Sequence, residues 1–236
     1  MNFKAREICL QSAPGARIHM IPNIAGFVGG DHTAMLIGIS AHTESRTIIA
    51  LDIGTNTEIS LLHQGTITSL SCPSGPALEG GHISCGMRAS TGAIEAISVT
   101  GDSLHIKTIG DADPIGLCGS AVVDATAAFF LAGGLNHRGQ IARDYRHTVL
   151  QDGEPVFMLH QGDPAVVFTQ RDVRSVQLAK GSIRAGIELL LEHAGLRYDQ
   201  LEKIVVAGAF GNYINIESAC TIGLFPRLPL ENFEQI

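Results

Sequence analysis

Alternating apolar and polar positions between residues 46 and 72 predict three consecutive strands. The segments RTIIALDI, EISLLHQ and TITSLSC follow a period of two and are rich in β-branched residues. The turn between the first two segments is Gly54-Thr55-Asn56-Thr57, whose Gly and Asn tolerate the positive φ that tight hairpin turns demand. We therefore expect a meander of three strands.

A second period, close to that of a helix, marks the region after Thr169. Thr169 is the expected N-cap of a long helix that ends at Gly195. Its apolar stripe is Val173, Val176, Leu178, Ile183, Ile187, Leu190 and Leu191. Shorter helices are predicted for residues 31–40, with Asp31 as the cap, and for residues 76–80, 116–133 and 214–223.

The remaining pattern predicts an α/β fold. A hairpin with its turn at Gly101-Asp102 is expected over residues 96–110, short strands over 139–168 and a strand over 203–210. A meander followed by strands that alternate with helices predicts a ribonuclease-H-like mixed sheet with flanking helices. The expected organisation is a lead-in segment and helix (1–45), one lobe (46–226) and a Pro-rich tail (227–236).

Composition narrows the function classes. With 236 residues, 45% of them hydrophobic, the chain can bury a large core and is neither disordered nor a coiled coil. A net charge of −7 argues against general nucleic-acid binding. The sequence contains neither a secretory signal nor an apolar run long enough for a membrane span. Five widely spaced cysteines without a C-x-x-C pair favour reduced thiols in the cytoplasm over disulfides or a metal cradle.

The first candidate site is the glycine turn in LDIGTNTE. An acidic residue, Asp52, ends an apolar strand and precedes small polar residues. The N–H groups and hydroxyls of such a turn can wrap a phosphate while Asp52 holds a metal ion through water. An ordinary hairpin with a solvated Asp explains the same pattern.

Three further glycine turns could bind part of a nucleotide. In VVAGAFGN a strand runs into a helix, and Gly208 and Gly211 leave room for a base or ribose. GLCGS, with Gly119 and Ser120, opens a helix, and so does GPALEG, which begins at Gly75 and contains Glu79. Tight packing between elements accounts for each of these turns equally well. Neither a Walker loop nor a G-x-G-x-x-G fingerprint is present.

Isolated candidates are weaker. Cys118 at a helix start could have a lowered pKa, but a small buried Cys is commoner. Lys180 is more typical of a solvated surface than of a nucleotide contact. The ten His residues lack metal-ligand spacing.

Taken in order, the turns resemble the second half of the nucleotide-binding core shared by actin, sugar kinases and heat-shock chaperones. The chain is most similar to the reductive activators of corrinoid-dependent enzymes. The matching segments are IAGFVGGDHTA, LDIGTNTEISL, SGPALEG with GMRASTGAI, IGLCGS, FTQRDVRSVQLAKGSIRAGIELLL, VVAGAFGNYI and IGLFP. The resemblance covers roughly residues 21 to 226 and implies the second lobe of an actin-like ATPase core.

Proteins of this family couple ATP to electron transfer from a [2Fe-2S] cluster onto a corrinoid, which returns Co(II) to Co(I). The resemblance implies ATP and Mg²⁺ as cofactors and a corrinoid protein as partner, with homodimerisation possible and no role for nucleic acid or a membrane. It assigns phosphate and water-mediated Mg²⁺ contacts to Asp52, Gly54, Thr55, Asn56 and Thr57. It assigns adenosine contacts to Gly208, Gly211 and Asn212, with Lys180 flanking the base. Weaker candidates for the site are Gly75, Glu79, Gly119 and Ser120. No catalytic residue is assigned.

The sequence departs from this family in two respects. It contains no cysteine cluster for [2Fe-2S] and no earlier DxGTT-type turn for the first phosphate loop. We therefore expect the C-terminal part of a longer protein, or a stand-alone remnant, that is inactive alone. A small-molecule kinase of the same superfamily and a non-catalytic interaction module are the alternatives.

Overall fold

The computed structural model describes residues 2–13, 15–208 and 210–236, and its central feature is a five-stranded mixed sheet. The predicted meander is confirmed, because three successive strands pair antiparallel. They are β3 (Ile48–Ile53), β4 (Thr57–His63) and β5 (Thr66–Cys72). Two parallel strands extend the sheet on the β3 side, β12 (Lys203–Ala207) and β13 (Phe233–Gln235). The α/β fold class is confirmed, and the segment 227–236, expected as a tail, supplies an edge strand of this sheet.

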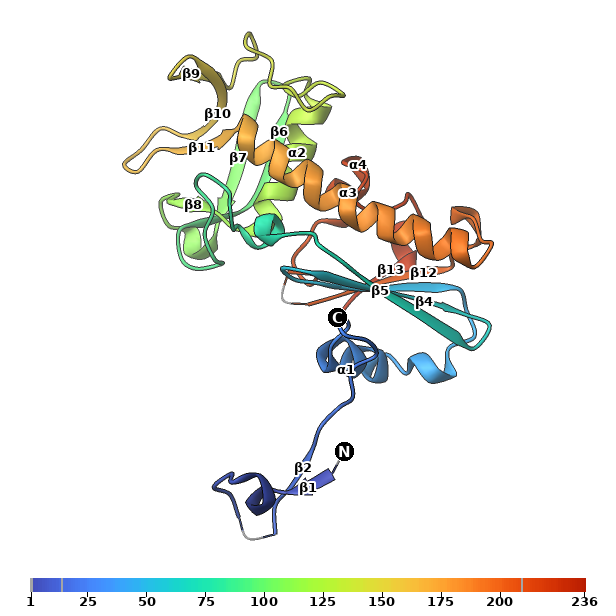
Figure 1. Cartoon of the computed structure of the whole chain (residues 1–236). Helices are drawn as coiled ribbons and strands as arrows, with labels where there is room; N and C mark the ends of the chain where they lie inside the picture. The colour runs from blue at the N-terminus through green and yellow to red at the C-terminus, as the bar shows by residue number, and fades with distance from the viewer. Residues whose placement is uncertain (1, 14, 209) are drawn as a thin grey trace.

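Helices cover both faces of the sheet because the apolar residues of β3 alternate between them (Figure 1). Ile48 and Ala50 pack beneath α1 (Gly30–Gly38), and Ile49 and Leu51 belong to the main core under α3 (Gln170–His193). At Gly186 of α3 an added Cβ would lie 2.5 Å from Cys72 Sγ, so the helix and the sheet approach very closely there.

The long helix α3 begins as predicted. Thr169 accepts a hydrogen bond from Asp172 N (3.2 Å), and Asp172 Oδ2 accepts one from Thr169 N (2.8 Å), which completes a capping box. Most of the predicted stripe is buried, but Leu178 is 77% exposed and does not belong to it. Val176 and Ala179, on the same turn of the helix, are fully buried. These two residues occupy the buried face of α3 at that turn, and Leu178 lies on the exposed face.

The segment between β5 and α3 forms a second layer of structure. A three-stranded sheet of order β7-β6-β8 packs against α2 (Gly119–Leu131). Its strands are β6 (Ala93–Thr100), β7 (Ser103–Thr108) and β8 (Gly116–Leu117). The hairpin turn at Gly101 is confirmed. The helix predicted for 116–133 starts later, because Gly116 and Leu117 pair in parallel with β6.

A third sheet, of order β11-β10-β9, follows α2 and fits the short strands predicted for this region. Its strands are β9 (Thr148–Gln151), β10 (Glu154–His160) and β11 (Val166–Thr169). Phe157 of β10 stacks on Phe129 of α2 with ring centroids 3.7 Å apart, which ties this sheet to the helix.

Several predicted boundaries shift. The N-cap of α1 is Gly29, and Asp31 lies in the first turn instead. The last helix, α4, spans only Ile216–Thr221, capped by Asn215. β12 ends before Gly208, and Ala209, at the end of the predicted strand, lies outside the described residues.

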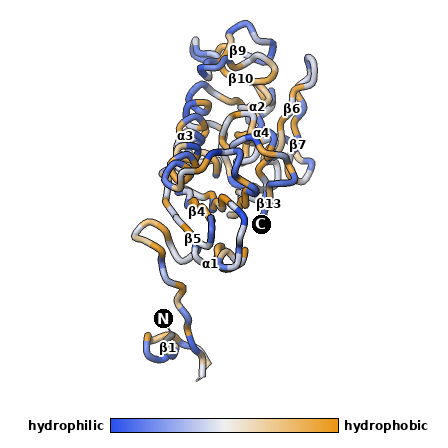
Figure 2. The backbone as a smooth tube through the Cα atoms, turned by 90° about the vertical axis from the view of Figure 1, so that its right-hand side faces the viewer, coloured by the Kyte–Doolittle hydropathy of each residue, from blue (hydrophilic) through white to orange (hydrophobic). Residues whose placement is uncertain are grey.

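The lead-in segment stands apart from the sheets. Strands β1 (Asn2–Lys4) and β2 (Arg17–His19) pair with each other and lie beyond α1 in two perpendicular views (Figures 1 and 2). Within this segment Leu10, Met20, Ile24 and Phe27 are exposed, Phe27 by 85%. Among the described residues, no helix combines the length and apolar character needed to cross a membrane.

Candidate functional site

Two glycine turns meet at one edge of the five-stranded sheet. β3 and β12 are parallel neighbours with Asp52 opposite Ala207, so their carboxyl ends lie together. Gly208 follows directly with a φ of 93°, and a Cβ added there would lie 2.8 Å from Asp52 Oδ1. In open α/β sheets, ligands bind outside the carboxyl ends of such strands. This edge is therefore the natural place for the nucleotide-binding residues that the sequence predicts.

A cavity of about 1210 Å³ opens at this edge. It is lined by the β3 turn, the 3₁₀ helix Pro76–Glu79, the start of α2 and the segment after β12. Seven of the predicted residues line it together: Asp52, Gly54, Thr55, Glu79, Gly119, Ser120 and Gly208. The fold thus brings three of the separate motifs, and the loop that contains Glu79, to one hollow.

Glu79 joins two of these motifs directly. Its Oε2 accepts a hydrogen bond of 2.6 Å from Thr55 Oγ1, although 24 residues separate the two in sequence. Both side chains are exposed to the cavity side of the molecule rather than buried in the core. The turn that follows β3 is therefore held by a carboxylate from the loop facing it.

The electrostatics around Asp52 favour a cation. Burial first, and the charge of Asp31 second, raise the pKa of the Asp52 carboxyl. Glu58 lies directly opposite Asp52 across β3 and β4, and burial and the charges of Asp52 and Asp31 raise its pKa as well. No ion pair of the described residues includes Asp52. The sequence had suggested Asp31 as a helix cap, so its electrostatic influence on Asp52 was not predicted.

Contacts within the protein account for Gly119 and Ser120 at the start of α2. A Cβ on Gly119 would lie 1.8 Å from the carbonyl oxygen of Leu78, so only glycine fits there. Ser120 Oγ donates to the carbonyl oxygen of Glu95 at 2.6 Å. Cys118 is 6% exposed, which agrees with the interpretation of a small buried cysteine.

Two predicted phosphate-site residues, Asn56 and Thr57, and the weaker candidate Gly75 do not line the cavity. Thr57 is fully buried, and its hydroxyl forms a hydrogen bond with Ser74 Oγ at 2.8 Å. Asn56 is exposed and does not line the cavity, but its carbonyl accepts from Gly54 N, which closes the turn. Gly75 caps the 3₁₀ helix with a φ of 72°. These residues shape the turn and its support.

The predicted adenosine residues are separated. Only Gly208 lines the cavity. At Gly211 a Cβ would lie 2.3 Å from the carbonyl oxygen of Ala207, so this glycine serves close packing, and Asn212 is exposed nearby. Lys180 is half-buried and lines a different cavity.

Arg88, Phe210 and Tyr213 also line the cavity and were missed by sequence reasoning. Arg88 is the one cationic side chain among the described lining residues, beside Asp52, Glu79 and Glu95. It belongs to GMRASTGAI, a segment noted only for its family resemblance. Tyr213 is 75% exposed at the rim.

The donor set fits a water-mediated Mg²⁺ better than a metal held by protein alone. No group of three or more His, Cys, Asp or Glu within the described ranges could hold a metal ion. Mg²⁺ keeps several waters and binds through one or two carboxylates together with substrate phosphates. An Asp carboxylate without an ion-pair partner in the described part of the chain, lining a cavity of nucleotide size, matches that requirement.

Comparison with known proteins adds a family match. Residues 46–236 match the model of a family described as the C-terminal domain of RACo, the ASKHA domain. The chain is 36% identical over 242 residues to the corrinoid activation enzyme RamQ of Eubacterium limosum and covers 40% of it. It is 30% identical over 227 residues to a [Co(II) methylated amine-specific corrinoid protein] reductase of Methanosarcina barkeri, covering 39% of that protein.

A solved structure shares the fold. The reductive activator for corrinoid,iron-sulfur protein superposes with a TM-score of 0.89 at 31% identity over 99% of this chain and 39% of that one. The chain therefore spans about 40% of the length of the curated relatives that it matches.

Proposed function

Because this chain belongs to the family of the C-terminal ASKHA domain of RACo, we propose that it is the nucleotide-binding lobe of an ATP-dependent reductive activator. The complete protein would return a corrinoid from Co(II) to Co(I) by transfer of one electron. The named activity of the relatives supports this role.

The single observation that carries the proposal is the convergence of the motifs on one cavity. Asp52, Gly54 and Thr55 come from one strand end, Gly208 from the neighbouring strand end and Glu79 from the facing loop. Because β3 and β12 are parallel neighbours, the sheet brings the two strand ends together, and Glu79 joins them through its hydrogen bond with Thr55.

We assign the roles in the cavity as follows. Asp52 would hold Mg²⁺ through water, and the backbone N–H group of Thr55 would bind phosphate, as would Arg88. Gly54 would lie beside the phosphate, with its own N–H donating to the Asn56 carbonyl within the turn. Gly208 lines the cavity and would lie against the ribose or base, while its missing Cβ leaves room for Asp52 and Ile53 of β3. Bound Mg²⁺ with ATP would supply charge neutralisation of the phosphates. Contacts from Gly211 and Asn212 stay predictions, and the separate cavity of Lys180 does not support its contact with the base.

The rest of the reaction lies outside this lobe. We infer that a [2Fe-2S] module elsewhere in the protein supplies the electron and that the partner is a corrinoid protein in the cytoplasm. The five cysteines are free. Half of a nucleotide cleft gives half of the contacts, so this chain alone would bind nucleotide weakly and hydrolyse it poorly. Homodimerisation is a further prediction, which light scattering of the purified chain tests.

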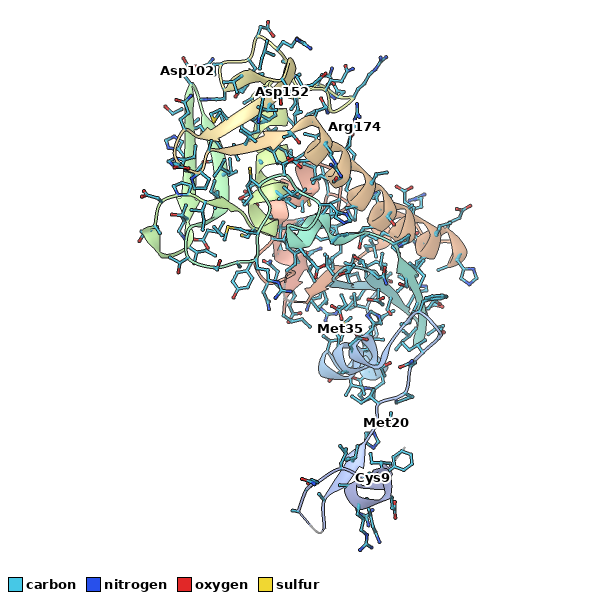
Figure 3. All side chains as sticks on the ribbon, turned by 60° about the vertical axis from the view of Figure 1, so that its left-hand side comes forward. Cys9, Met20, Met35, Asp102, Asp152 and Arg174 are labelled. Carbon is cyan, nitrogen blue, oxygen red and sulfur yellow. The ribbon has the colours of Figure 1, made fainter. Side chains whose placement is uncertain are left out.

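Calorimetric titration of the purified chain with Mg-ATP and Mg-ADP tests the proposal. We expect a Kd of about 1 mM or tighter for Mg-ADP and at least tenfold weaker binding, about 1.4 kcal/mol, for Asp52→Asn. The matched control is Asp152→Asn, in the β9–β10 turn far from α1 (Figure 3). It makes the same change in charge and is expected to bind as the wild type does.

Two outcomes contradict the assignment. Absence of binding at millimolar nucleotide favours the interaction module. Binding that Asp52→Asn leaves unchanged places the nucleotide elsewhere. Turnover of ATP by this chain at the rate of a complete relative would overturn the claim that it is inactive alone.

A further inference from the structure

A second cavity of about 550 Å³ lies on the α2–α3–α4 side of the molecule. Its walls are the C-terminal half of α2, the middle of α3, the loop around Asn136 and the segment that follows α4. It shares no lining residue with the cavity at Asp52. The proposed function uses none of its residues.

The charge of this cavity is opposite to that of the chain. Lys180, Arg184 and Arg227 line it, and no Asp or Glu does so among the described residues. Glu188, outside the lining, forms an ion pair with Arg184, so Lys180 and Arg227 carry the uncompensated charge. The chain as a whole has a net charge of −7. Cations gathered in a hollow with low-dielectric walls attract anions far more strongly than scattered surface charges do.

Local contacts fix the two cations that come from α3. Lys180 Nζ donates to the carbonyl oxygen of Ile222 at 2.5 Å, which leaves two of its three N–H donors available. The Arg184 guanidinium lies 4.4 Å from the centre of the Tyr198 ring, and Arg184 Nε donates to Tyr198 OH at 2.8 Å and to Glu188 Oε1 at 2.9 Å. Both head groups are therefore held in position before any ligand arrives, which lowers the entropy cost of binding.

The remaining wall is apolar and partly aromatic. Phe130 and Phe225 line it with Val173 and Val176 of α3. Phe130 also meets the His137 ring edge to face, with centroids 5.3 Å apart. A cavity that combines fixed cations with an apolar wall fits a molecule that has both an anionic and an apolar part.

A neighbouring hollow increases the positive potential. It shares Asn136, Gly139 and Gln177 with the cavity, and its own walls add Arg138, Arg143 and Arg174 against one carboxylate, Glu154. Arg174 extends from α3 toward the solvent near β9 (Figure 3). Anions approaching this side of the molecule therefore meet a basic entrance.

We propose that the cavity lined by Lys180, Arg184 and Arg227 binds a small organic anion, in which a phosphate or carboxylate is joined to an apolar ring or chain. The anionic group contacts Lys180 and Arg227, and the apolar part lies against Phe130 and Phe225. Helix α2 connects the two cavities, because its start lines the cavity at Asp52 and its C-terminal half lines this one.

The experiment is an NMR titration of the ¹⁵N-labelled chain with phenyl phosphate, benzoate and inorganic phosphate. We expect the amides of Gln177, Ile222 and Gly223 to shift with phenyl phosphate, and those of Thr55 and Gly80 to stay in place. Benzoate binding more tightly than phenyl phosphate identifies the carboxylate as the preferred anion, and the reverse identifies the phosphate. Inorganic phosphate, which has no apolar part, should bind at least tenfold more weakly than the better of these two.

The test variants are Lys180→Met and Arg227→Met. Lys180→Met keeps the apolar stem and removes the charge, and we expect about tenfold weaker binding. Arg227 is exposed, so Arg227→Met should weaken binding about threefold without affecting the fold. Lys4→Met is the matched control, since it makes the same change of charge on the exposed lead-in segment and should bind as the wild type does.

Several results would overturn the proposal. One is the absence of a saturable shift with both phenyl phosphate and benzoate. Another is inorganic phosphate binding as tightly as the organic anions. A third is Lys4→Met weakening binding as much as Lys180→Met does. If Lys180→Met does not fold, the Arg227→Met variant decides by itself, and binding as tight as that of the wild type overturns the proposal. Saturation with Mg-ADP should leave phenyl phosphate binding intact, so failure here is distinguishable from failure of the proposed function.

Discussion

Asp52 is a half-buried carboxylate that faces another acid, Glu58, across the strand pair and has no cation of the described residues beside it. Like charges placed directly opposite each other in a sheet are destabilising. Because its pKa is raised, the folded state holds the proton more firmly than the unfolded state does. Stability therefore falls as the pH rises through the range above the ordinary Asp pKa.

The substitution Asp52→Asn should accordingly stabilise the nucleotide-free chain at pH 7. We expect its free energy of unfolding in urea to rise by about 1 kcal/mol. The gain should fade as the pH falls through the raised pKa of the wild-type carboxyl, because the carboxyl then takes up its proton. Asp152→Asn should leave the free energy of unfolding unchanged, and a loss of stability in Asp52→Asn would show that the carboxylate has a structural partner.

Substitution by alanine should have opposite effects on the free energy of unfolding at two glycines, Gly208 and Gly181. Gly208 has a φ of 93° and no room for a Cβ, so Gly208→Ala should lower the free energy of unfolding by about 1–3 kcal/mol. Gly181 lies inside α3 with open space around it, so Gly181→Ala should raise it by about 0.5–1 kcal/mol. Urea unfolding of both variants checks the pair, and equal effects would contradict it.

The capping box at Thr169 fixes where the 24-residue α3 begins. Thr169→Ala removes the oxygen that accepts from Asp172 N and should cost about 1 kcal/mol in the free energy of unfolding. Ser175→Ala, one turn and a half further along the same helix, is the control. It loses only a bond to the carbonyl of Arg171 and should be neutral or slightly stabilising. The prediction fails if the two alanine variants unfold alike.

His32 makes the docking of α1 on the sheet sensitive to pH. It is fully buried, its Nε2 forms a hydrogen bond with Ser60 Oγ at 2.7 Å, and burial lowers its pKa to about 4. The unfolded chain therefore binds a proton first as the pH falls below 6.5. The stability present above that pH is lost as the pH falls toward 4.

Between pH 7 and pH 5 this group should cost the folded state about 1–2 kcal/mol. His32→Gln should lose correspondingly less stability than the wild type over the same interval, measured by urea unfolding at both values. His193→Gln, at the exposed end of α3, should behave as the wild type does. Parallel behaviour of all three proteins would show that His32 is not the group responsible.

Elements with a strong local pattern could be predicted, and their ends often could not. The period-two segments of the meander and the cap of α3 are local signals, and both are confirmed. The start of α2 depends on the parallel pairing of Gly116 with Ala93, a contact between distant residues. Leu178 shows the same limit, since it was predicted as part of the apolar stripe while the packing of α3 leaves it 77% exposed.

At the scale of the whole molecule, the sequence identified the turns that line the cavity better than it identified the individual residues that do so. Asp52, Thr55 and Gly208 belong to one cavity because two strands are parallel neighbours. Lys180 and Arg88 could not be placed by motif, because helix packing sends Lys180 to the far side and a loop brings Arg88 inward.

The lead-in segment should be the first part of the molecule to be cleaved by a protease. Its basic residues Lys4, Arg6 and Arg17 are exposed, and the β1–β2 pair that contains Lys4 and Arg17 lies apart from the five-stranded sheet (Figure 1). Trypsin should cut there at least about tenfold faster than at Arg171 or Arg174 of α3, which mass spectrometry of a time course would show. Equal rates would mean that α3 opens as readily as the lead-in segment.

The alternation of β3 restricts where the chain can change in length. One residue inserted between Ile48 and Asp52 would send the side chains that pack under α1 to the α3 face and remove the carboxylate from its cavity. A residue inserted in the turn at Asp152 and Gly153 would only lengthen an exposed loop. Natural relatives of this lobe should therefore vary in length at the β9–β10 turn and keep a constant length from Ile48 to Asp52.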